Sequence, residues 1–467
     1  MDDKVYFYDT KQYTYDKKLI DDAIDGLFGL MKLDEKNKHT DDWNPLSKYI
    51  SPGDKVLIKP NMVMDYNRSG EGTECLYTQA EVVDAVLRYV CRALDGKGSI
   101  IVGDAPMQEC NFDNLISQSG YQSVIDKYQT QGIDIKLIDF RELTTDVING
   151  IRHQKINNKA SGMVIDLGIE SEFSQFSDEK LDRLRITNYD PQRLKTHHTS
   201  GKHEYYVSKY VLDADVIINM PKPKTHRKAG VTIAMKNLVG INARKEYLPH
   251  HTLGSPEVGG DQSKRDNVLI RLSNKCYDRK NYHEGKSDYR RAWIYKLVGG
   301  GIKFFYSRAR GDSLEGSWSG NNTICRTIID LNKILLYCDS KGNLQEDIQR
   351  RILNIADMII SGEKEGPVAP SPKNVGYLVA GENSLTFDIA VATMMGADVA
   401  RIPTIQMAIN TVVKGKDLFG NIRDAEVVSN NILIDTLNAS QIKEDDKWDF
   451  VPTSGWRDVF HITNDRS

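Results

Sequence analysis

The sequence predicts an α/β protein of two domains, in which largely parallel sheets are flanked by helices. Three observations favour this class. Short apolar runs alternate with stretches of helical periodicity, as in chains that form parallel sheets. The run Val216–Met220 is almost wholly apolar, which is typical of a strand buried on both faces. The length of 467 residues exceeds what one simple core usually supports.

The N-terminal half contains the first alternation of helices and strands. Residues 17–49 and 80–94 place their apolar side chains on one helical face. Pro52, Gly53 and Asp54 predict a turn between these two helices. We expect strands over 55–61, 98–106, 133–138 and 163–167.

The C-terminal half contains a second α/β unit. Before it, residues 245–288 are rich in Gly, His and charged residues and predict a long loop or excursion. An amphipathic helix interrupted by the glycines at 299–301 is expected over 289–308. Further on we expect helices over 323–337, 346–357 and 384–395, strands over 358–361 and 376–380, and a proline-rich loop over 368–374. The predicted domains are 1–265, then 266–320 as a loop and helical excursion, then 321–467.

The composition excludes several classes of function. A hydrophobic content of 40% and a charged content of 27% are ordinary for a soluble globular protein. The net charge of −3 gives no basic field that would attract nucleic acid or an anionic membrane. The N-terminus lacks the apolar core of a signal peptide, and the most apolar helical stretch, 292–306, is short and contains Lys296 and Lys303. We therefore expect a cytoplasmic protein that binds neither nucleic acid nor membrane.

Missing motifs narrow the chemistry further. The six cysteines are scattered without a CxxC pair, which favours free thiols in a reducing compartment. The same scatter argues against an iron–sulfur cluster or a structural zinc site. None of GxxxxGK[ST], GxGxxG, GxSxG or HExxH occurs, so the usual signatures of nucleotide binding, hydride transfer, acyl transfer and zinc proteolysis are absent.

Polar residues with Gly or Pro follow four apolar runs, at 59–61, 103–106, 222–226 and 362–367. Each segment alone is ordinary turn chemistry. Because the carboxyl ends of parallel strands meet in one crevice, the four together predict a small-molecule site. We expect the ligand to be a small anion, bound by Lys59, Asn61, Lys222, Lys224 and Asn237, with Arg244 as a weaker candidate.

His226 is the expected general base. Five lysines and arginines lie within ten residues of it, and such cations lower the pKa of an imidazole and keep it neutral. A neutral imidazole can take a proton from a C–H or O–H whose anion the cations stabilise. We predict His226, Lys236 and Asp104 as catalytic residues, with Asp104 as an orienting or metal-binding carboxylate. A solvated basic loop around His226 is the alternative.

Other candidate residues leave alternatives open. His250 and His251, with Asp261 downstream, predict a divalent metal or a mobile loop. Trp318 predicts a stacking contact with a substrate or a polar turn beside a buried ring. A buried carboxylate without a partner is costly, so each of three aspartates in apolar runs is expected to be an ion-pair partner, a cap or a metal ligand. These are Asp330, Asp357 and Asp388.

Several blocks occur in order along most of the chain: VLIKPNMV (56–63), VGDAP (102–106), ADVIINMPKPKTH (214–226), TIAMKNLVGI (232–241), GSWSGNNTICRTIIDLNKILLY (316–337), IADMIISGEKEGP (355–367) and SLTFDIAVATMMGAD (384–398). In these blocks the chain resembles the bacterial and archaeal proteins known as domain-of-unknown-function family 362. Many members carry a ferredoxin-like CxxC module. This chain lacks one, so the resemblance does not imply electron transfer.

His226, Gly230 and Lys236 have a spacing in which glycine follows histidine by four residues and lysine follows it by ten. In this spacing the chain is similar, more distantly, to the lactate racemases that carry a nickel-pincer nucleotide. That similarity implies their fold, their site location, a cofactor on Lys236 and a nickel ligand at His250 or His251. Residues 59–61 would replace their Arg-Pro clamp. Their small Ser-Gly-Gly stretch is 232–235 here, which leaves less room for a nucleotide.

These observations together favour an enzyme acting on a small carboxylate or phosphate. The expected chemistry is histidine-mediated proton transfer in an interdomain cleft, as in an isomerase, epimerase or lyase. The alternative is a non-catalytic protein that binds a metabolite or a metal in the same crevice.

Overall fold

In the part of the chain that the structure describes, residues 3–310 and 315–460 of a computed structural model, one mixed sheet of eleven strands forms the centre. Two of these strands, β12 (Lys224–His226) and β13 (Gly230–Thr232), lie beside the main path. The main path runs β20 (Leu437–Asn438), β19 (Glu426–Ser429), β1 (Lys4–Asp9), β16 (Ala369–Gly381), β15 (Arg351–Glu365), β11 (Val216–Met220), β2 (Lys55–Pro60), β3 (Ser99–Asp104) and β4 (Ile135–Asp139).

Small sheets and helices surround the central sheet. The small sheets are β7 (Gly162–Asp166) with β10 (Lys202–Ser208) and β9 (His198–Thr199), β14 (His251–Thr252) with β8 (Leu184–Arg185), β17 (Val412–Val413) with β18 (Lys416–Asp417), and β5 (Leu143–Ile148) with β6 (Ile151–Ile156). The described α-helices are α1 (Lys17–Leu30), α2 (Ala80–Leu94), α3 (Phe112–Gln118), α4 (Tyr121–Thr130), α5 (Asp178–Asp182), α6 (Pro191–His197), α7 (Lys209–Leu212), α8 (Ala234–Asn237), α9 (Val268–Gly285), α10 (Tyr289–Arg310), α11 (Ile324–Tyr337), α12 (Ser384–Met394) and α13 (Pro403–Asn410). None of these described helices is long and apolar enough to span a bilayer.

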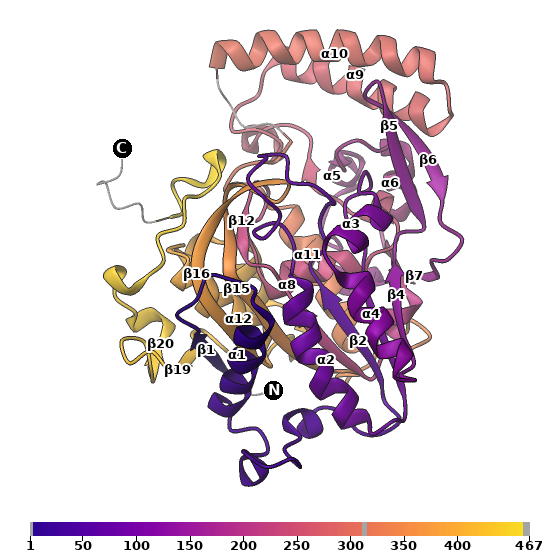
Figure 1. Cartoon of the computed structure of the whole chain (residues 1–467). Coiled ribbons are helices and arrows are strands. Elements are labelled where there is room, and N and C mark those ends of the chain that lie inside the picture. The colour runs from indigo at the N-terminus through magenta and orange to yellow at the C-terminus, as the bar shows by residue number, and fades with distance from the viewer. Residues whose placement is uncertain (1–2, 311–314, 461–467) are drawn as a thin grey trace.

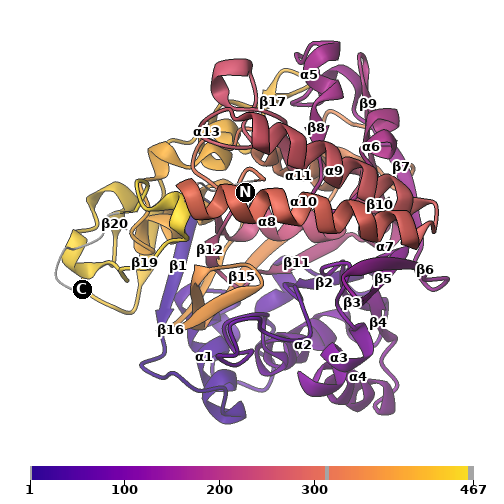
Figure 2. The same ribbon diagram turned by 90° about the horizontal axis from the view of Figure 1, so that it is seen from above.

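Helices cover both faces of the central sheet (Figure 1). Successive residues of β2 alternate between two hydrophobic cores: Val56 and Ile58 pack with α1 and α2, whereas Leu57 packs with α11 and α12. Seen from above, α1 to α4 lie on one side of the sheet and α8, α11 and α13 on the other (Figure 2). Strands flanked on both faces must be apolar on both, which explains the continuous apolar runs of the sequence.

The predicted α/β class is confirmed, with a large and largely parallel sheet. From β15 through β11, β2 and β3 to β4, each strand is parallel to the next. β16 is antiparallel to both of its neighbours, β1 and β15. The lactate-racemase arrangement and the division into domains stay predictions. Strands from before residue 265 and after residue 321 share this one sheet.

Two elements predicted in the C-terminal half are wrong. The helix expected over 346–357 is instead mostly β15, because β11 and β16 pair with both of its edges and this pairing outweighs a helical pattern. The proline-rich loop expected over 368–374 lies mostly in β16. Pro370 and Pro372 are tolerated there because β1 pairs only with the later residues of β16, so one edge of the strand is open at the prolines.

Residues 245–288, expected as a long loop or an excursion, are not all loop, because they contain α9. The glycines at 299–301 do not interrupt α10 either. A Cβ at Gly299 would lie 3.0 Å from the Cβ of Cys276, so the missing side chain permits close packing of the two helices. We call α9 and α10 together the helical hairpin.

The topology brings distant segments to one edge of the sheet. β2, β3 and β11 are parallel neighbours, so their carboxyl ends lie together. After β11 the chain forms the β12–β13 pair and then α8, and Lys224 of β12 lies opposite Gly362 of β15. Three of the four polar segments predicted from the sequence therefore meet at this edge, and β15 brings the fourth beside them.

Candidate functional site

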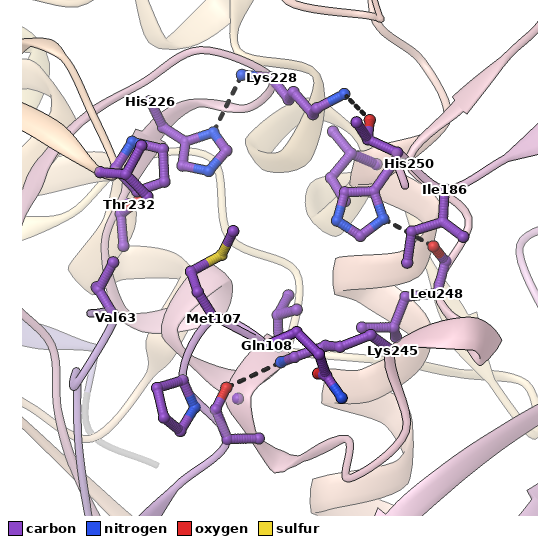
Figure 3. A pocket seen from close by; sticks show the side chains of 18 of the residues that line it. Val63, Met107, Gln108, Ile186, His226, Lys228, Thr232, Lys245, Leu248 and His250 are labelled. Atoms are coloured by element: carbon purple, nitrogen blue, oxygen red, sulfur yellow. Dashed lines mark hydrogen bonds between the residues drawn. The ribbon is translucent and has the colours of Figure 1, made fainter. Parts of the chain in front are cut away.

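A cavity of about 310 Å³ lies at the carboxyl ends of the parallel strands. Its lining includes six residues predicted from the sequence: Asn61, Asp104, His226, Lys236, Asn237 and His250. Figure 3 shows His226, Lys245 and His250 around the same space, with His226 from one segment of the chain and the other two from another. Among the described residues that line the cavity, six are lysine or arginine and three are carboxylates, so the cavity is cationic.

Lys59 and Asp104 form a buried ion pair beneath the cavity. The Lys59 Nζ lies 2.8 Å from the Asp104 Oδ1, and neither side chain is more than 4% exposed. The other Asp104 oxygen accepts a hydrogen bond from the backbone N–H of Met62 at 2.8 Å. A Cβ at Gly240 would lie 1.8 Å from the Asp104 Oδ1, so only glycine permits this approach. Burial lowers the pKa of Lys59, and Asp104 opposes that shift.

Four asparagines, which we call the asparagine chain, link the strand ends. The Nδ2 of Asn61 donates to the Oδ1 of Asn237 at 2.9 Å. The Nδ2 of Asn237 donates to the Oδ1 of Asn219, and the Nδ2 of Asn219 donates to the Oδ1 of Asn354, both at 2.8 Å. Lys224 enters the chain at one end, donating from its Nζ to the Oδ1 of Asn61. Lys224 therefore supports the cavity wall rather than lining the cavity.

Two lysines that face the cavity have a pKa well below the ordinary value of a lysine amine. Lys236 makes no hydrogen bond or ion pair with a described residue, and burial together with nearby Lys59 lowers its pKa to about 8. Lys245, which the sequence did not single out, donates from its Nζ to the carbonyl of Ala105 at 2.8 Å. Burial is the main cause that lowers the pKa of Lys245 to about 7. Lys245 is therefore about half-protonated at neutral pH, whereas Lys236 is still mostly protonated there.

The tautomer of His226 follows from its contacts. Its Nδ1 accepts hydrogen bonds from the backbone N–H groups of Lys228 and Ala229, both at 3.1 Å. Burial, and then nearby Lys236, hold the pKa of His226 well below its usual range, so the ring is neutral. A neutral ring with an accepting Nδ1 carries its proton on Nε2. His226 therefore offers the cavity a hydrogen-bond donor.

His250 has the opposite tautomer. Its Nδ1 lies 2.7 Å from the carbonyl of Leu248, which can only accept, so this nitrogen carries the proton. Burial, and then nearby Lys228, lower the pKa of His250 to about 3. The Nε2 of His250 therefore keeps a free lone pair. The cavity thus contains one imidazole donor and one imidazole acceptor.

The three aspartates in apolar runs have structural partners. Asp388 of α12 accepts from the backbone N–H of Ala234 at 2.8 Å and so fixes the start of α8, the helix that carries Lys236. Asp330 accepts from Tyr205 at 2.8 Å and from Ser171, which fits neither the lysine pairing nor the metal ligation expected for it. Asp357 forms an ion pair with Lys222, in line with one of the alternatives left open.

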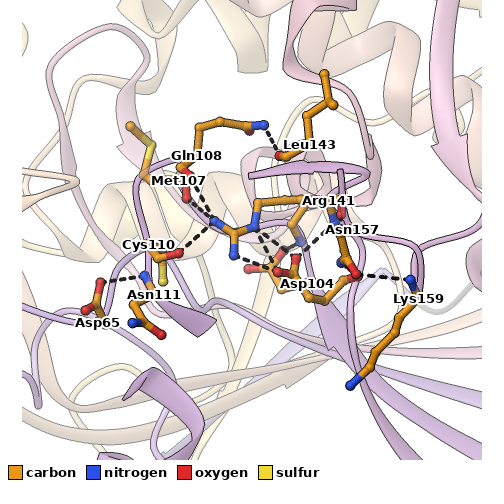
Figure 4. Close-up of polar contacts among 12 residues, drawn as sticks. Asp65, Asp104, Met107, Gln108, Cys110, Asn111, Arg141, Leu143, Asn157 and Lys159 are labelled. Atoms are coloured by element: carbon orange, nitrogen blue, oxygen red, sulfur yellow. Dashed lines mark hydrogen bonds and ion pairs between the residues drawn. The ribbon is translucent and has the colours of Figure 1, made fainter. Parts of the chain in front are cut away.

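Arg141 shapes the cavity but was not predicted. Its guanidinium pairs with Asp139 at 2.6 Å and donates to the carbonyls of Met107 and Cys110, at 2.6 and 3.0 Å (Figure 4). Met107 lines the cavity, so the buried guanidinium holds part of the wall in place. A signal was present: Asp139 is the last residue of β4 and Arg141 follows it, which repeats the pattern of polar residues after an apolar run.

Several predicted site residues lie elsewhere. Lys222 is wholly buried against Asp357, 2.9 Å away, and donates to the hydroxyl of Tyr15. Trp318 donates from its ring N–H to the carbonyl of Asp261 and does not line the cavity. His251 belongs to β14 and lies outside the lining, and Arg244 pairs with Glu142.

The cavity supplies few ligands for a bare metal ion. Within residues 3–310 and 315–460, no group of three or more His, Cys, Asp or Glu side chains is placed to hold a metal ion. His250 supplies one free imidazole nitrogen to the cavity, whereas His251 lies outside the lining. The nickel nucleotide stays a prediction.

The fold and the cavity define an α/β protein with a cationic cavity at the carboxyl ends of parallel strands. The chain belongs to the family described as Domain of unknown function (DUF362), whose model matches residues 56–164 and 149–393. These matched residues include all of the predicted site residues and the whole helical hairpin.

A relative is the thylakoid-associated protein of Synechocystis sp., with 27% identity over 225 residues. The matched part is 48% of this chain and 49% of that protein, so the chain spans about half the length of the relative it matches. This match alone is too partial to carry an activity from one protein to the other.

We predict that Lys222 stabilises the fold and does not bind the ligand. Lys222→Met leaves the buried carboxylate of Asp357 without its cation, which should lower the free energy of unfolding by about 3–5 kcal/mol in urea denaturation. The double variant Lys222→Met/Asp357→Leu should recover most of that loss. A Lys222→Met protein of normal stability that no longer binds anions would contradict this role.

We predict that Lys236 and Lys245 make the free energy of unfolding depend on pH. The folded protein releases these protons near pH 8 and 7, whereas the ordinary lysine pKa is 10.5. Between these values the unfolded chain binds more protons, so this contribution to the free energy of unfolding rises with pH from about 7 to about 10. Compared with the unchanged protein, Lys236→Met should gain most in free energy of unfolding below pH 7, and this gain should shrink as the pH rises. Urea titrations across this pH range measure the difference.

Leu248→Met is the matched control for this experiment, because it changes the same cavity without removing an amine. It should follow the pH dependence of the unchanged protein. If the free energy of unfolding of Lys236→Met has the same pH dependence as that of the unchanged protein, the Lys236 amine does not titrate in this range.

Proposed function

We propose that the protein binds a small anionic metabolite, a carboxylate or a phosphate, in the cavity and transfers a proton to or from it. The observation that carries this proposal is the Lys236 amine, which lines the cavity and has no partner among the described residues. Placing a buried ammonium without a counter-ion is unfavourable, and a bound anion would supply the missing charge.

Lys236 is the proton carrier in this proposal, in place of His226. Its pKa of about 8 is close to physiological pH, where an acid–base group exchanges protons most effectively. His226 is poorly suited to be the base, because a free lone pair on Nε2 would require a proton on Nδ1, where two backbone N–H groups point. Its Nε2–H is instead suited to stabilise negative charge that develops on the substrate.

Lys245 and His250 complete the proposed binding site. Lys245 gains a proton more readily when an anion is present, because an opposite charge raises the pKa of an amine. The Nε2 of His250 accepts a hydrogen bond from a hydroxyl or amine of the same ligand. Asp104 has an orienting role through Lys59 in this proposal. In this proposal the protein is cytoplasmic and is an isomerase, an epimerase or a lyase.

The second candidate function is binding without catalysis. The excess of lysine and arginine in the cavity favours anion binding whether or not a proton moves. The two functions differ in one measurable property, since only an enzyme exchanges a carbon-bound hydrogen of its ligand with solvent.

Hydrogen exchange in heavy water tests the proposed function. The protein is incubated with a panel of small carboxylates and phosphate esters, and loss of the C–H signal next to the acid group is followed by NMR. Exchange with at least one compound that Lys236→Met abolishes would support proton transfer. Tight binding measured by calorimetry, with no exchange over hours, would favour the non-catalytic function.

We predict that two substitutions of His226 distinguish the roles of its two ring nitrogens. His226→Asn retains an acceptor for the backbone N–H groups but removes the donor into the cavity, so anion affinity or exchange should fall about tenfold or more while the melting temperature changes little. His226→Gln places an amide N–H near the former Nε2 and should retain more activity. Equal activity of His226→Asn and the unchanged protein would exclude a ligand contact by the Nε2–H.

A further inference from the structure

Helix α10 turns an apolar face away from the protein. We define the apolar face as Trp293, Ile294, Leu297 and Val298, whose side chains are between 47% and 53% exposed. Their spacing puts them on one side of the helix. A helix on the surface of a globular protein normally turns its apolar stripe towards the core, so this orientation is the reverse of the usual one.

The inner side of α10 explains the reversal. It consists partly of small residues, Ala292 and Gly299, which are buried against α9. The hydroxyl of Ser273 on α9 donates to the carbonyl of Gly299 at 3.3 Å. Lys296 donates from its Nζ to the carbonyl of Asn149, in the turn between β5 and β6, at 2.8 Å. These contacts fix which side of α10 faces inward and leave the large apolar side chains outside.

Helix α9 extends the same kind of surface. Its first turns expose Val268, Leu269 and Leu272, which are between 43% and 75% exposed. Figures 1 and 2 show α9 and α10 side by side across one end of the molecule. The hairpin therefore presents large apolar side chains from two helices at an end of the protein that nothing in the described chain covers.

The hairpin is also strongly basic. Residues 264–310 contain thirteen lysines and arginines but only four carboxylates, in a chain whose net charge is −3. Arg290 and Arg291 are exposed at the start of α10, beside the apolar face, and Lys275 and Arg279 are exposed on α9. Apolar aromatic and aliphatic side chains flanked by cations are the composition of helices that lie in the headgroup region of an anionic bilayer.

We propose that the helical hairpin docks the protein on the surface of an anionic lipid bilayer, with the apolar face inserted among the headgroups. The charge of the hairpin favours this occupant over a second copy of the chain, because two such basic surfaces would repel each other. This docking is independent of the function proposed for the cavity. It differs from spanning, since these helices lie along the bilayer. It departs from the expectation that the protein binds no membrane, because that expectation rested on the net charge of the whole chain and the hairpin is locally basic.

Co-sedimentation of the full-length protein with lipid vesicles tests the docking. The protein should sediment with vesicles of equal parts phosphatidylglycerol and phosphatidylcholine, and far less with phosphatidylcholine alone. Leu297→Glu places a charge in the apolar face and should weaken binding about tenfold or more. Ile432→Glu is the matched control, because Ile432 is 90% exposed in a distant turn, and it should bind as the unchanged protein does.

The cationic contribution has its own variant. Arg290→Gln/Arg291→Gln should weaken binding about tenfold or more at low salt and reduce the dependence of binding on salt. Circular dichroism melts establish that the variants remain folded, as exposed substitutions should.

Three outcomes would overturn the docking. The unchanged protein could remain in the supernatant with anionic vesicles at low salt, or Leu297→Glu could bind them equally well. In the third outcome, ultracentrifugation without lipid shows a dimer that Leu297→Glu dissociates, so a second copy covers the face.

Discussion

The site depends on the asparagine chain and on the direction in which its hydrogen bonds run. The carbonyl of Gly381 can only accept, so Asn354 must donate to it from Nδ2, at 3.2 Å. Each amide then has only its oxygen left for the next donor, and the same direction passes along to Lys224 at the other end. All of these groups are buried, so breaking one link leaves an unpaired polar group at a cost of about 1–3 kcal/mol.

The fixed direction of these hydrogen bonds helps to distinguish the lysines that have structural partners from Lys236, which has none among the described residues. Lys224 is engaged by Asn61, Lys59 by Asp104 and Lys222 by Asp357. Lys236 belongs to the same helix as Asn237 yet has no such partner among the described residues, although Asp388 holds the start of that helix in place. The fold thus immobilises the surroundings of one amine without neutralising it. Such preorganisation is what a charge-binding site needs, because no further ordering is required when the anion enters.

The sequence was most informative where a local pattern and the fold agree. Helix α2 has the bounds that its periodicity predicts, and the strand ends of β2, β3 and β11 meet as parallel topology requires. It was least informative where a distant segment decides. Residues 351–365 form β15 because neighbouring strands pair with both of its edges. Lys222 pairs with Asp357 and so does not line the cavity. The backbone N–H groups after His226 determine which of its ring nitrogens carries the proton. Lys245 was missed because its partner, the carbonyl of Ala105, is set by the fold alone.

The cavity and the helical hairpin meet at Arg152 of β6. Its side chain lines the cavity and pairs with Glu109, which also pairs with Arg68. Its backbone N–H donates to Glu284 of α9 at 3.2 Å, and Lys280 holds that same glutamate at 2.9 Å. If an anion in the cavity draws Arg152 away from Glu109, the change acts on a strand that contacts α9 directly. The cavity proposed for an anion and the hairpin proposed for a bilayer are consequently joined by a short run of ion pairs and hydrogen bonds rather than by an independent linker.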